Sequence, residues 1–232
     1  MLQTSWMFLG NRMAPKRLHK SSCDKPVSLL ILEGDTEEIF YSIVQNKFLH
    51  DIRFKRTNIK GRGNVNRDML GEIYKYAYSN RRDLVRVYCC IDTERQKKSA
   101  TPFDLGFVCE QVQARQMTCV LSISAILADP DIESWFFYDI NGIYKFLGVR
   151  KSQRSTKKYR NPKNLCKKEL QQLFRRFDKV YLPGRKATHL INNLDIEKIV
   201  ANCETLREGI LLIQSKADDL TNHLFPDKKS KK

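Results

Sequence analysis

Three mainly apolar runs constrain the fold of this chain more than any other feature. They lie at residues 27–32, 84–91 and 118–123. A continuous apolar run is typical of a strand covered on both faces, as in a parallel sheet. Between the runs, Asp35 or Thr36 is predicted to be the N-cap of a helix, further helices are predicted at residues 66–78 and 103–116, and residues 54–59 are typical of a short exposed strand. The pattern predicts an α/β fold with a parallel, Rossmann-like sheet flanked by helices.

The chain has 232 residues, which is enough to bury a core without disulfides or structural metals. We predict an α/β core at residues 25–145, followed by a basic and mostly helical region or lid at residues 146–225. Its last element is an amphipathic helix at residues 206–224. The two ends, residues 1–24 and 226–232, are predicted to be a flexible segment and a basic tail.

Acidic residues stand where the predicted strands end. Glu33 closes the first run and Glu37 follows one turn later, Asp92 and Glu94 follow the second run, and Glu133 comes after the third. Because the carboxyl ends of parallel strands meet at one edge of a sheet, these side chains are expected to lie close together. Clustered carboxylates repel one another unless a cation neutralises them, and Mg²⁺ prefers oxygen ligands. The sequence therefore predicts a site for Mg²⁺ or Mn²⁺ at this edge.

Two segments, LILEGDTEEIFY and DPDIESWFFYD, resemble motifs of the Toprim domain. The similarity extends over about residues 27–139 and more weakly over residues 183–194. Toprim domains serve topoisomerases, bacterial primases and several nucleases, and this chain is most similar to the stand-alone Toprim proteins near the OLD-type nucleases. Some of those proteins belong to phage-defence systems. The resemblance implies a metal-dependent endonuclease acting in antiviral defence, because the chain has no room for the strand-passage domains of a topoisomerase.

The resemblance also implies a role for each acid. Glu33 matches the glutamate shared by Toprim domains, which is a metal ligand or a general base, and Glu37 matches the second acid of the same turn. Asp92 and Glu94 match the acid-x-acid pair that holds metal. The second position of that pair is usually Asp, so the longer Glu94 side chain departs from the pattern.

The later part of the chain supplies two more implied roles. Glu133 matches the acid that binds a second metal ion in the OLD branch. That branch also uses a late lysine to stabilise transition-state charge, and Lys186 in GRKATHL is our candidate. Asp129 and Asp131, on either side of Pro130, are interpreted as helix-capping acids.

The chain is strongly basic, with 42 Lys and Arg against 26 Asp and Glu and a formal charge of +16. Residues 145–186 alone contain fifteen Lys and Arg against two acids. This field predicts binding to the phosphates of DNA or RNA. Three interleaved aromatic residues, Tyr159, Phe174 and Tyr181, are interpreted as platforms for unpaired bases. The predicted nucleic-acid contacts are Lys157, Lys158, Arg160, Lys167, Lys168, Arg175, Arg176 and Arg185, with a smaller patch of Arg53, Lys55, Arg56, Lys60 and Arg62.

Other features indicate the cellular compartment but leave alternative functions open. The seven cysteines include no CxxC pair, so they are interpreted as small core residues in a reducing, cytoplasmic location. No apolar run is long enough for a membrane span. One alternative is a ribonuclease specific for tRNA or another RNA. Another is a non-catalytic nucleic-acid-binding subunit of a defence complex, beside a partner ATPase, since the chain has no P-loop. The oligomeric state stays open, a homo-oligomer included.

Overall fold

The computed structural model of the chain describes residues 25–61, 63–94 and 101–217. The predictions made for residues 1–24, for Arg62 and for residues 218–232 lie outside this part of the chain.

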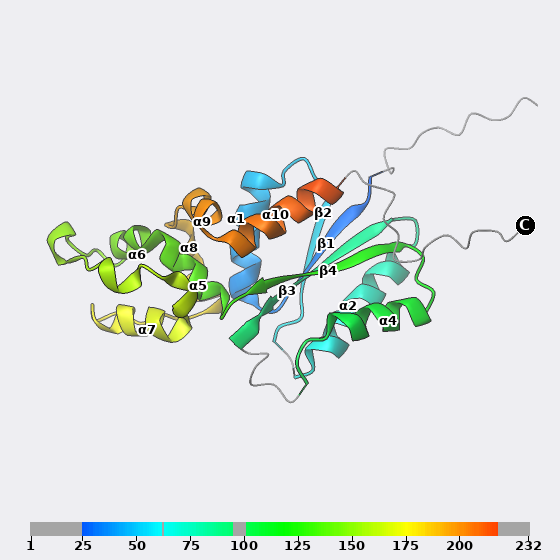
Figure 1. Cartoon of the computed structure of the whole chain (residues 1–232), viewed down its shortest axis with the longest axis horizontal. Coiled ribbons are helices and arrows are strands. Elements are labelled where there is room, and N and C mark those ends of the chain that lie inside the picture. Colours follow the sequence, from blue (N-terminus) through cyan, green and yellow to red (C-terminus); the bar gives the residue numbers. More distant parts are fainter. Residues whose placement is uncertain (1–24, 62, 95–100, 218–232) are drawn as a thin grey trace, which may run out of the picture.

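Four parallel strands form one sheet in the order β2-β1-β3-β4 (Figure 1). The strands are β1 (Val27–Leu32), β2 (Phe54–Asn58), β3 (Val85–Asp92) and β4 (Val120–Ala128). The predicted α/β fold with a parallel sheet is therefore confirmed. β4 extends five residues beyond the predicted end at residue 123, because Ser124 to Ala128 continue the pairing with β3.

Helices connect the strands and cover both faces of the sheet. The connections contain α1 (Asp35–Phe48), α2 (Val65–Ser79) and α4 (Leu105–Ala114). Leu30 and Leu32 of β1 belong to the apolar cluster that includes α1, whereas Leu29 and Ile31 belong to the cluster that includes α2 and α4. Both faces of β1 are thus buried, which explains why its sequence is apolar without alternation.

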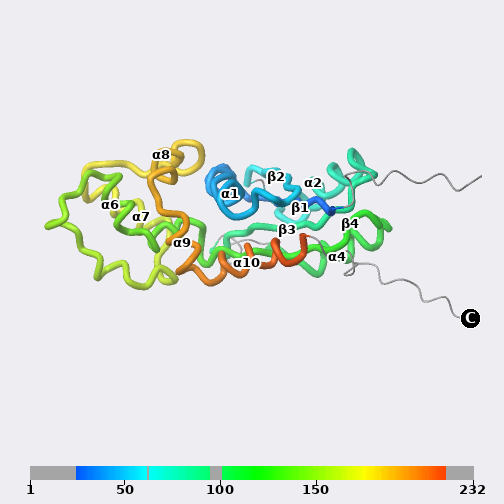
Figure 2. Tube along the Cα trace, turned by 90° about the horizontal axis from the view of Figure 1, so that it is seen from above, coloured from blue at the N-terminus to red at the C-terminus, as the bar shows by residue number. Residues whose placement is uncertain are grey.

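After β4 the chain is mainly helical, and Figure 2 shows α6, α7 and α8 gathered beyond one end of the sheet. The elements are α5 (Ile132–Phe136), η1 (Phe137–Asp139), α6 (Ile140–Phe146), η2 (Lys151–Gln153), η3 (Lys157–Tyr159), η4 (Pro162–Asn164), α7 (Lys167–Arg175), η5 (Gly184–Ala187), α8 (Thr188–Asn192), α9 (Ile196–Asn202) and α10 (Glu204–Lys216). The last of these returns to the sheet, where Gly209 lies so close to Ile126 that a Cβ atom would be 2.9 Å from its Cγ2. One apolar cluster joins this sheet face to the helical region.

Within the described residues, no helix is both long enough and apolar enough to cross a membrane.

The start of α1 differs from the prediction. The helix begins after Gly34 and has no side-chain cap, so the predicted caps Asp35 and Thr36 are wrong. The Thr36 hydroxyl instead accepts a hydrogen bond of 2.8 Å from the Gly184 N–H, which comes from a segment 148 residues later. A contact over this sequence distance cannot be read from local periodicity.

The strand order creates a crevice between β1 and β3. These strands are neighbours, but the chain leaves β1 toward β2 on one side and leaves β3 toward β4 on the other. Ligands of open parallel sheets bind beyond the carboxyl ends of the strands at such a switch point. Here those ends are Glu33 and Asp92.

Candidate functional site

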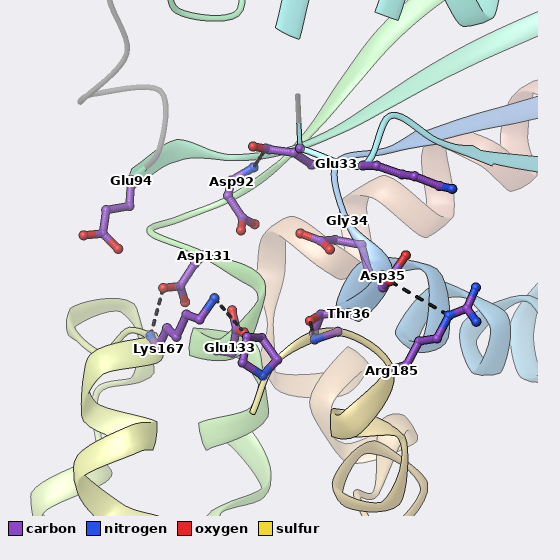
Figure 3. Close-up of a pocket in the computed structure, with 15 residues that line it drawn as sticks. Glu33, Gly34, Asp35, Thr36, Asp92, Glu94, Asp131, Glu133, Lys167 and Arg185 are labelled. Carbon is purple, nitrogen blue, oxygen red and sulfur yellow. Dashed lines mark hydrogen bonds and ion pairs between the residues drawn. The ribbon is translucent and has the colours of Figure 1, made fainter. Parts of the chain in front are cut away.

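A cavity of about 650 Å³ lies at this switch point (Figure 3). Its walls come from the ends of β1 and β3, the start of α1, the segment before and within α5, and the segment that leads into η5. Seven acids line it, namely Glu33, Asp35, Glu37, Asp92, Glu94, Asp131 and Glu133, against three cations, Lys60, Lys167 and Arg185. A strongly basic protein thus contains an acidic cavity.

All five acids that the sequence singled out for metal binding line this cavity, together with Asp131. Glu33 is 4% exposed, and its Oε2 accepts a hydrogen bond of 3.2 Å from the Asp92 N–H, which joins the ends of β1 and β3. The Glu33 carbonyl also accepts a bond of 2.7 Å from the Gly61 N–H. These bonds fix the position of Glu33 at the floor of the cavity.

The carboxylates of Asp92 and Asp131 are held by backbone N–H groups. Asp92 Oδ1 accepts a hydrogen bond of 3.1 Å from Ile132, at the start of α5. Asp131 caps α5 through Ser134, as predicted, and its second oxygen accepts 2.8 Å from the Lys167 N–H at the start of α7. Asp129 accepts from the Thr93 hydroxyl and does not cap α5, so that part of the capping prediction is wrong.

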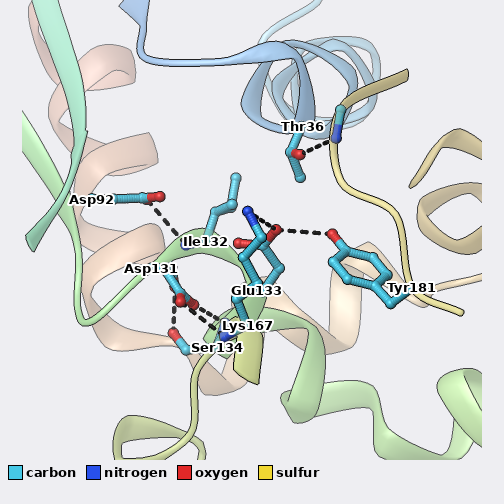
Figure 4. A network of polar contacts seen from close by, with 9 residues as sticks. Thr36, Asp92, Asp131, Ile132, Glu133, Ser134, Lys167 and Tyr181 are labelled. Atoms are coloured by element: carbon cyan, nitrogen blue, oxygen red, sulfur yellow. Dashed lines mark hydrogen bonds and ion pairs between the residues drawn. The ribbon is translucent and has the colours of Figure 1, made fainter. Parts of the chain in front are cut away.

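Glu133 is buried at 3% exposure and has two partners from the helical region (Figure 4). The Tyr181 hydroxyl donates a hydrogen bond of 2.9 Å to its Oε1. The Lys167 ammonium lies 3.9 Å from the same oxygen. The helical region therefore contributes directly to the acidic site.

Burial raises the pKa of several of these carboxyls. It raises the pKa of Glu37 to about 7, and the charges of Glu133 and Glu33 add to the effect. Burial, together with the charges of Glu37 and Glu133, also raises the pKa of Asp92 well above its usual range. The pKa of Asp131 rises to about 7 and that of Glu133 also rises, with burial as the main cause in both. The cavity therefore disfavours its own negative charge.

Gly34 lies so close to the Glu37 side chain that a larger residue would not fit without moving it. Its φ of −150° is extended and accessible to any residue. A Cβ atom at this position would lie 2.9 Å from Oε2 of Glu37, so a larger residue would push that carboxylate aside. Because Gly34 has no side chain, the Glu37 carboxylate can occupy its position in the cavity.

Ligand-type atoms of Glu94, Asp131 and Cys166 lie within 4.8 Å of one another, close enough to share one metal ion. This group differs from the predicted trio of Glu33, Asp92 and Glu94. Cys166 had been interpreted as a small core residue, but it is half-buried, and its thiol lies 2.8 Å from Glu169 at the start of α7. Nothing in the cysteine spacing points to this placement.

The predicted basic residues divide into two groups. Lys167 and Arg185 line the cavity, as does Lys60, whereas Lys186 is exposed and does not line it. In the smaller patch, Arg53 forms an ion pair of 2.8 Å with Asp83 and Arg56 donates a bond of 2.7 Å to Gln45. Lys55 is exposed on β2. Arg62 lies outside the described residues. The six remaining predicted contacts are all exposed, namely Lys157, Lys158, Arg160, Lys168, Arg175 and Arg176.

Sequence reasoning missed two residues of the site. Lys167 was assigned only to the basic surface, and Tyr181 was interpreted as a base-stacking residue although its hydroxyl binds Glu133 inside the protein. Lys167 is the first residue of α7, which is capped by Cys166, and Cys is not a preferred N-cap residue, so the sequence gives no clear signal for this helix start. No local signal identifies Tyr181, because its partner lies 48 residues away.

Comparison with protein-family models, with curated proteins and with solved structures found no match to this chain. The similarity to Toprim domains therefore stays a prediction from the sequence motifs. A functional assignment depends on the residues of the cavity themselves.

Proposed function

We propose that this protein is a nuclease of the Toprim type that depends on Mg²⁺ or Mn²⁺. The observation that supports this proposal is the convergence of seven carboxylates in one cavity at the switch point of a parallel sheet. Burial raises the pKa of four of them, so their ionised forms are unfavourable in the cavity. A bound divalent cation would neutralise this negative charge. The strongly basic surface of the same protein suits a phosphate-rich substrate.

Five carboxylates would divide the metal-binding work. Glu33, Asp92 and Glu94 would hold the main ion, and Glu37 and Glu133 would assist a second one. When bound, such ions activate a water molecule and neutralise the charge that develops on the phosphate. Asp131, which the sequence assigned only to capping, lies close enough to Glu94 to share an ion with it.

The cations of the cavity would act on the substrate. Lys167 extends into the cavity beside Glu133, so its ammonium can stabilise negative charge on a phosphate held there. It takes the role that the resemblance suggested for the exposed Lys186. Lys167→Gln should therefore lower the cleavage rate by roughly a hundredfold, whereas Lys186→Gln should change it by no more than a few-fold. Equal losses in the two variants would contradict this assignment.

Cleavage assays test the proposal directly. Labelled single-stranded DNA, plasmid DNA and bulk tRNA are incubated with the protein in Mg²⁺, in Mn²⁺ or in EDTA. We expect metal-dependent cleavage that Glu33→Gln abolishes, because the amide can still accept the Asp92 N–H but loses the charge that holds metal. Glu38→Gln is the matched control, since Glu38 is an exposed glutamate on the neighbouring helix α1 and does not line the cavity.

The substrate panel also separates the alternatives. Cleavage of tRNA alone would identify a ribonuclease. Binding without cleavage in any metal would overturn the nuclease and favour a nucleic-acid-binding subunit, with or without a partner ATPase. From the sequence resemblance we further propose that the protein acts in the cytoplasm as an effector of antiviral defence. Equal survival of infected cells with the wild-type protein and with Glu33→Gln would contradict that role.

A further inference from the structure

The three aromatic residues interpreted as base platforms are not available to stack on bases, and the other two rings of residues 145–186, Phe146 and Phe177, are half-buried against Phe174 and Tyr144. Tyr159 and Phe174 are 4% exposed and Tyr181 is 3% exposed. The Tyr159 ring stacks on Phe137 at 5.3 Å, and the rings of Phe174 and Tyr181 meet edge to face at 5.4 Å. The interpretation of these residues as base platforms is therefore wrong. They form the core under the basic surface.

The cations of the same segment point outward. In α7, Leu170, Leu173 and Phe174 are buried, whereas Lys168 and Arg175 are exposed. Two turns of helix separate Lys168 from Arg175, so both lie on one face. Lys157, Lys158 and Arg160, which are in and next to η3, are also exposed. We call these five cations the α7 basic face: Lys157, Lys158, Arg160, Lys168 and Arg175.

The helix that carries part of the α7 basic face begins at the cavity. The first residue of α7, Lys167, lines the cavity through its side chain and binds Asp131 through its backbone N–H (Figure 3). From there to Arg175 the helix axis advances about 12 Å at 1.5 Å per residue. That length corresponds to roughly three to four nucleotide steps of a double helix at 3.4 Å each. Two aromatic residues are exposed elsewhere: Tyr78 on α2 and Phe107 on α4. These two helices cover the face of the sheet opposite α1.

We propose that the α7 basic face binds double-helical nucleic acid through its phosphates, in preference to a single strand. The inference rests on the proposed function, since the phosphates that it contacts would flank the one in the cavity. Proteins that bind single strands gain about 1–3 kcal/mol from each base that stacks on an aromatic side chain, and the buried rings of this segment remove that gain. Contacts made only by cations favour the duplex, because its phosphates release more counterions per contact than those of a single strand. With five such contacts at 0.1 M salt the preference amounts to roughly tenfold.

Fluorescence anisotropy of the full-length Glu33→Gln protein in EDTA tests this inference apart from cleavage. The probes are labelled duplex DNA, duplex RNA and the two single strands, each titrated over a range of salt concentrations. We expect a duplex to bind roughly tenfold more tightly than its own single strands. The double change Lys168→Ala with Arg175→Ala should weaken duplex binding by roughly tenfold or more at 0.1 M salt and reduce the slope of log K against log salt by about 2.

The matched control is Arg81→Ala with Arg82→Ala, which removes the same charge from exposed arginines of the turn before β3. It should leave duplex binding within about twofold of the parent. Single-strand binding as tight as duplex binding, or equal losses in the two double variants, would overturn the inference. Binding is measured without metal, so a failure of the proposed nuclease would appear as duplex binding without cleavage in the wild-type protein.

Discussion

Glu37→Gln should stabilise the protein in the absence of metal. Glu37 is 8% exposed and lies in the cavity with Glu33 and Glu133. Burial raises its pKa from 4.5 to about 7. At about 1.4 kcal/mol per pKa unit, the ionised carboxylate costs the folded protein roughly 3 kcal/mol relative to the unfolded chain. Glutamine occupies the same volume without the charge.

The sign of the pH dependence follows from the raised pKa. The folded protein binds the Glu37 proton more tightly than the unfolded chain, so its stability falls as the pH rises from about 4.5 to about 7. Below this range the carboxyl is protonated in both states and the wild type and the variant should be equally stable. At pH 8 the variant should be more stable by up to roughly 3 kcal/mol.

Urea unfolding followed by circular dichroism measures this difference between pH 4 and pH 8 in EDTA. Glu38→Gln, on the same helix but exposed, should change the free energy of unfolding by less than about 0.5 kcal/mol at every pH. Added Mg²⁺ should stabilise the wild type more than Glu37→Gln, because the variant lacks one proposed ligand. A variant as stable as the wild type at pH 8, or a difference that does not change with pH, would refute the reasoning.

Two further changes probe the neighbours of these carboxylates. Tyr181→Phe removes the hydroxyl that donates to buried Glu133 and should lower the free energy of unfolding by about 2 kcal/mol and the Mg²⁺ affinity roughly tenfold. Tyr144→Phe, which loses a comparable bond away from the cavity, should leave Mg²⁺ titrations unchanged, and a similar loss of affinity in both variants would count against the role of Tyr181. Gly34→Ala should weaken Mg²⁺ binding in calorimetry with little change in stability, since its Cβ would displace the flexible carboxylate of Glu37. Unchanged Mg²⁺ affinity would show that this carboxylate does not hold metal.

Much of the sheet and its acidic edge was predictable from local signals. The continuous apolar run of β1 reflects burial on both faces, and the acid at its end, Glu33, needed only the rule that parallel strands end at one edge. The helix signals were weaker at their ends. The Thr36 hydroxyl suits an N-cap in isolation, but Gly184 occupies it.

The charge run of residues 145–186 was correctly counted but its aromatic residues were misread. A linear count cannot tell which side of a short helix faces the core. The spacing of Leu170, Leu173 and Phe174 predicts that these three side chains face the core, because residues three and four apart share one face of a helix. Read as a helix, residues 167–175 place Phe174 inside and Lys168 and Arg175 outside, whereas Tyr159 and Tyr181 lie outside this helix and are buried by tertiary packing.

The sequence alone determined which carboxylates stand at the ends of parallel strands. Apolar runs identify the buried strands, and the helical segments between them indicate that the strands are parallel. Only the tertiary structure decided what joins them. Tyr181, Lys167 and Gly184 reach the cavity from a helical region far along the chain. Tyr181 binds Glu133, Lys167 contacts both Asp131 and Glu133, and Gly184 binds Thr36. Such contacts depend on how the helical region packs against the end of the sheet. That packing is set by a shared apolar core whose long-range pairings leave no periodic trace in the sequence.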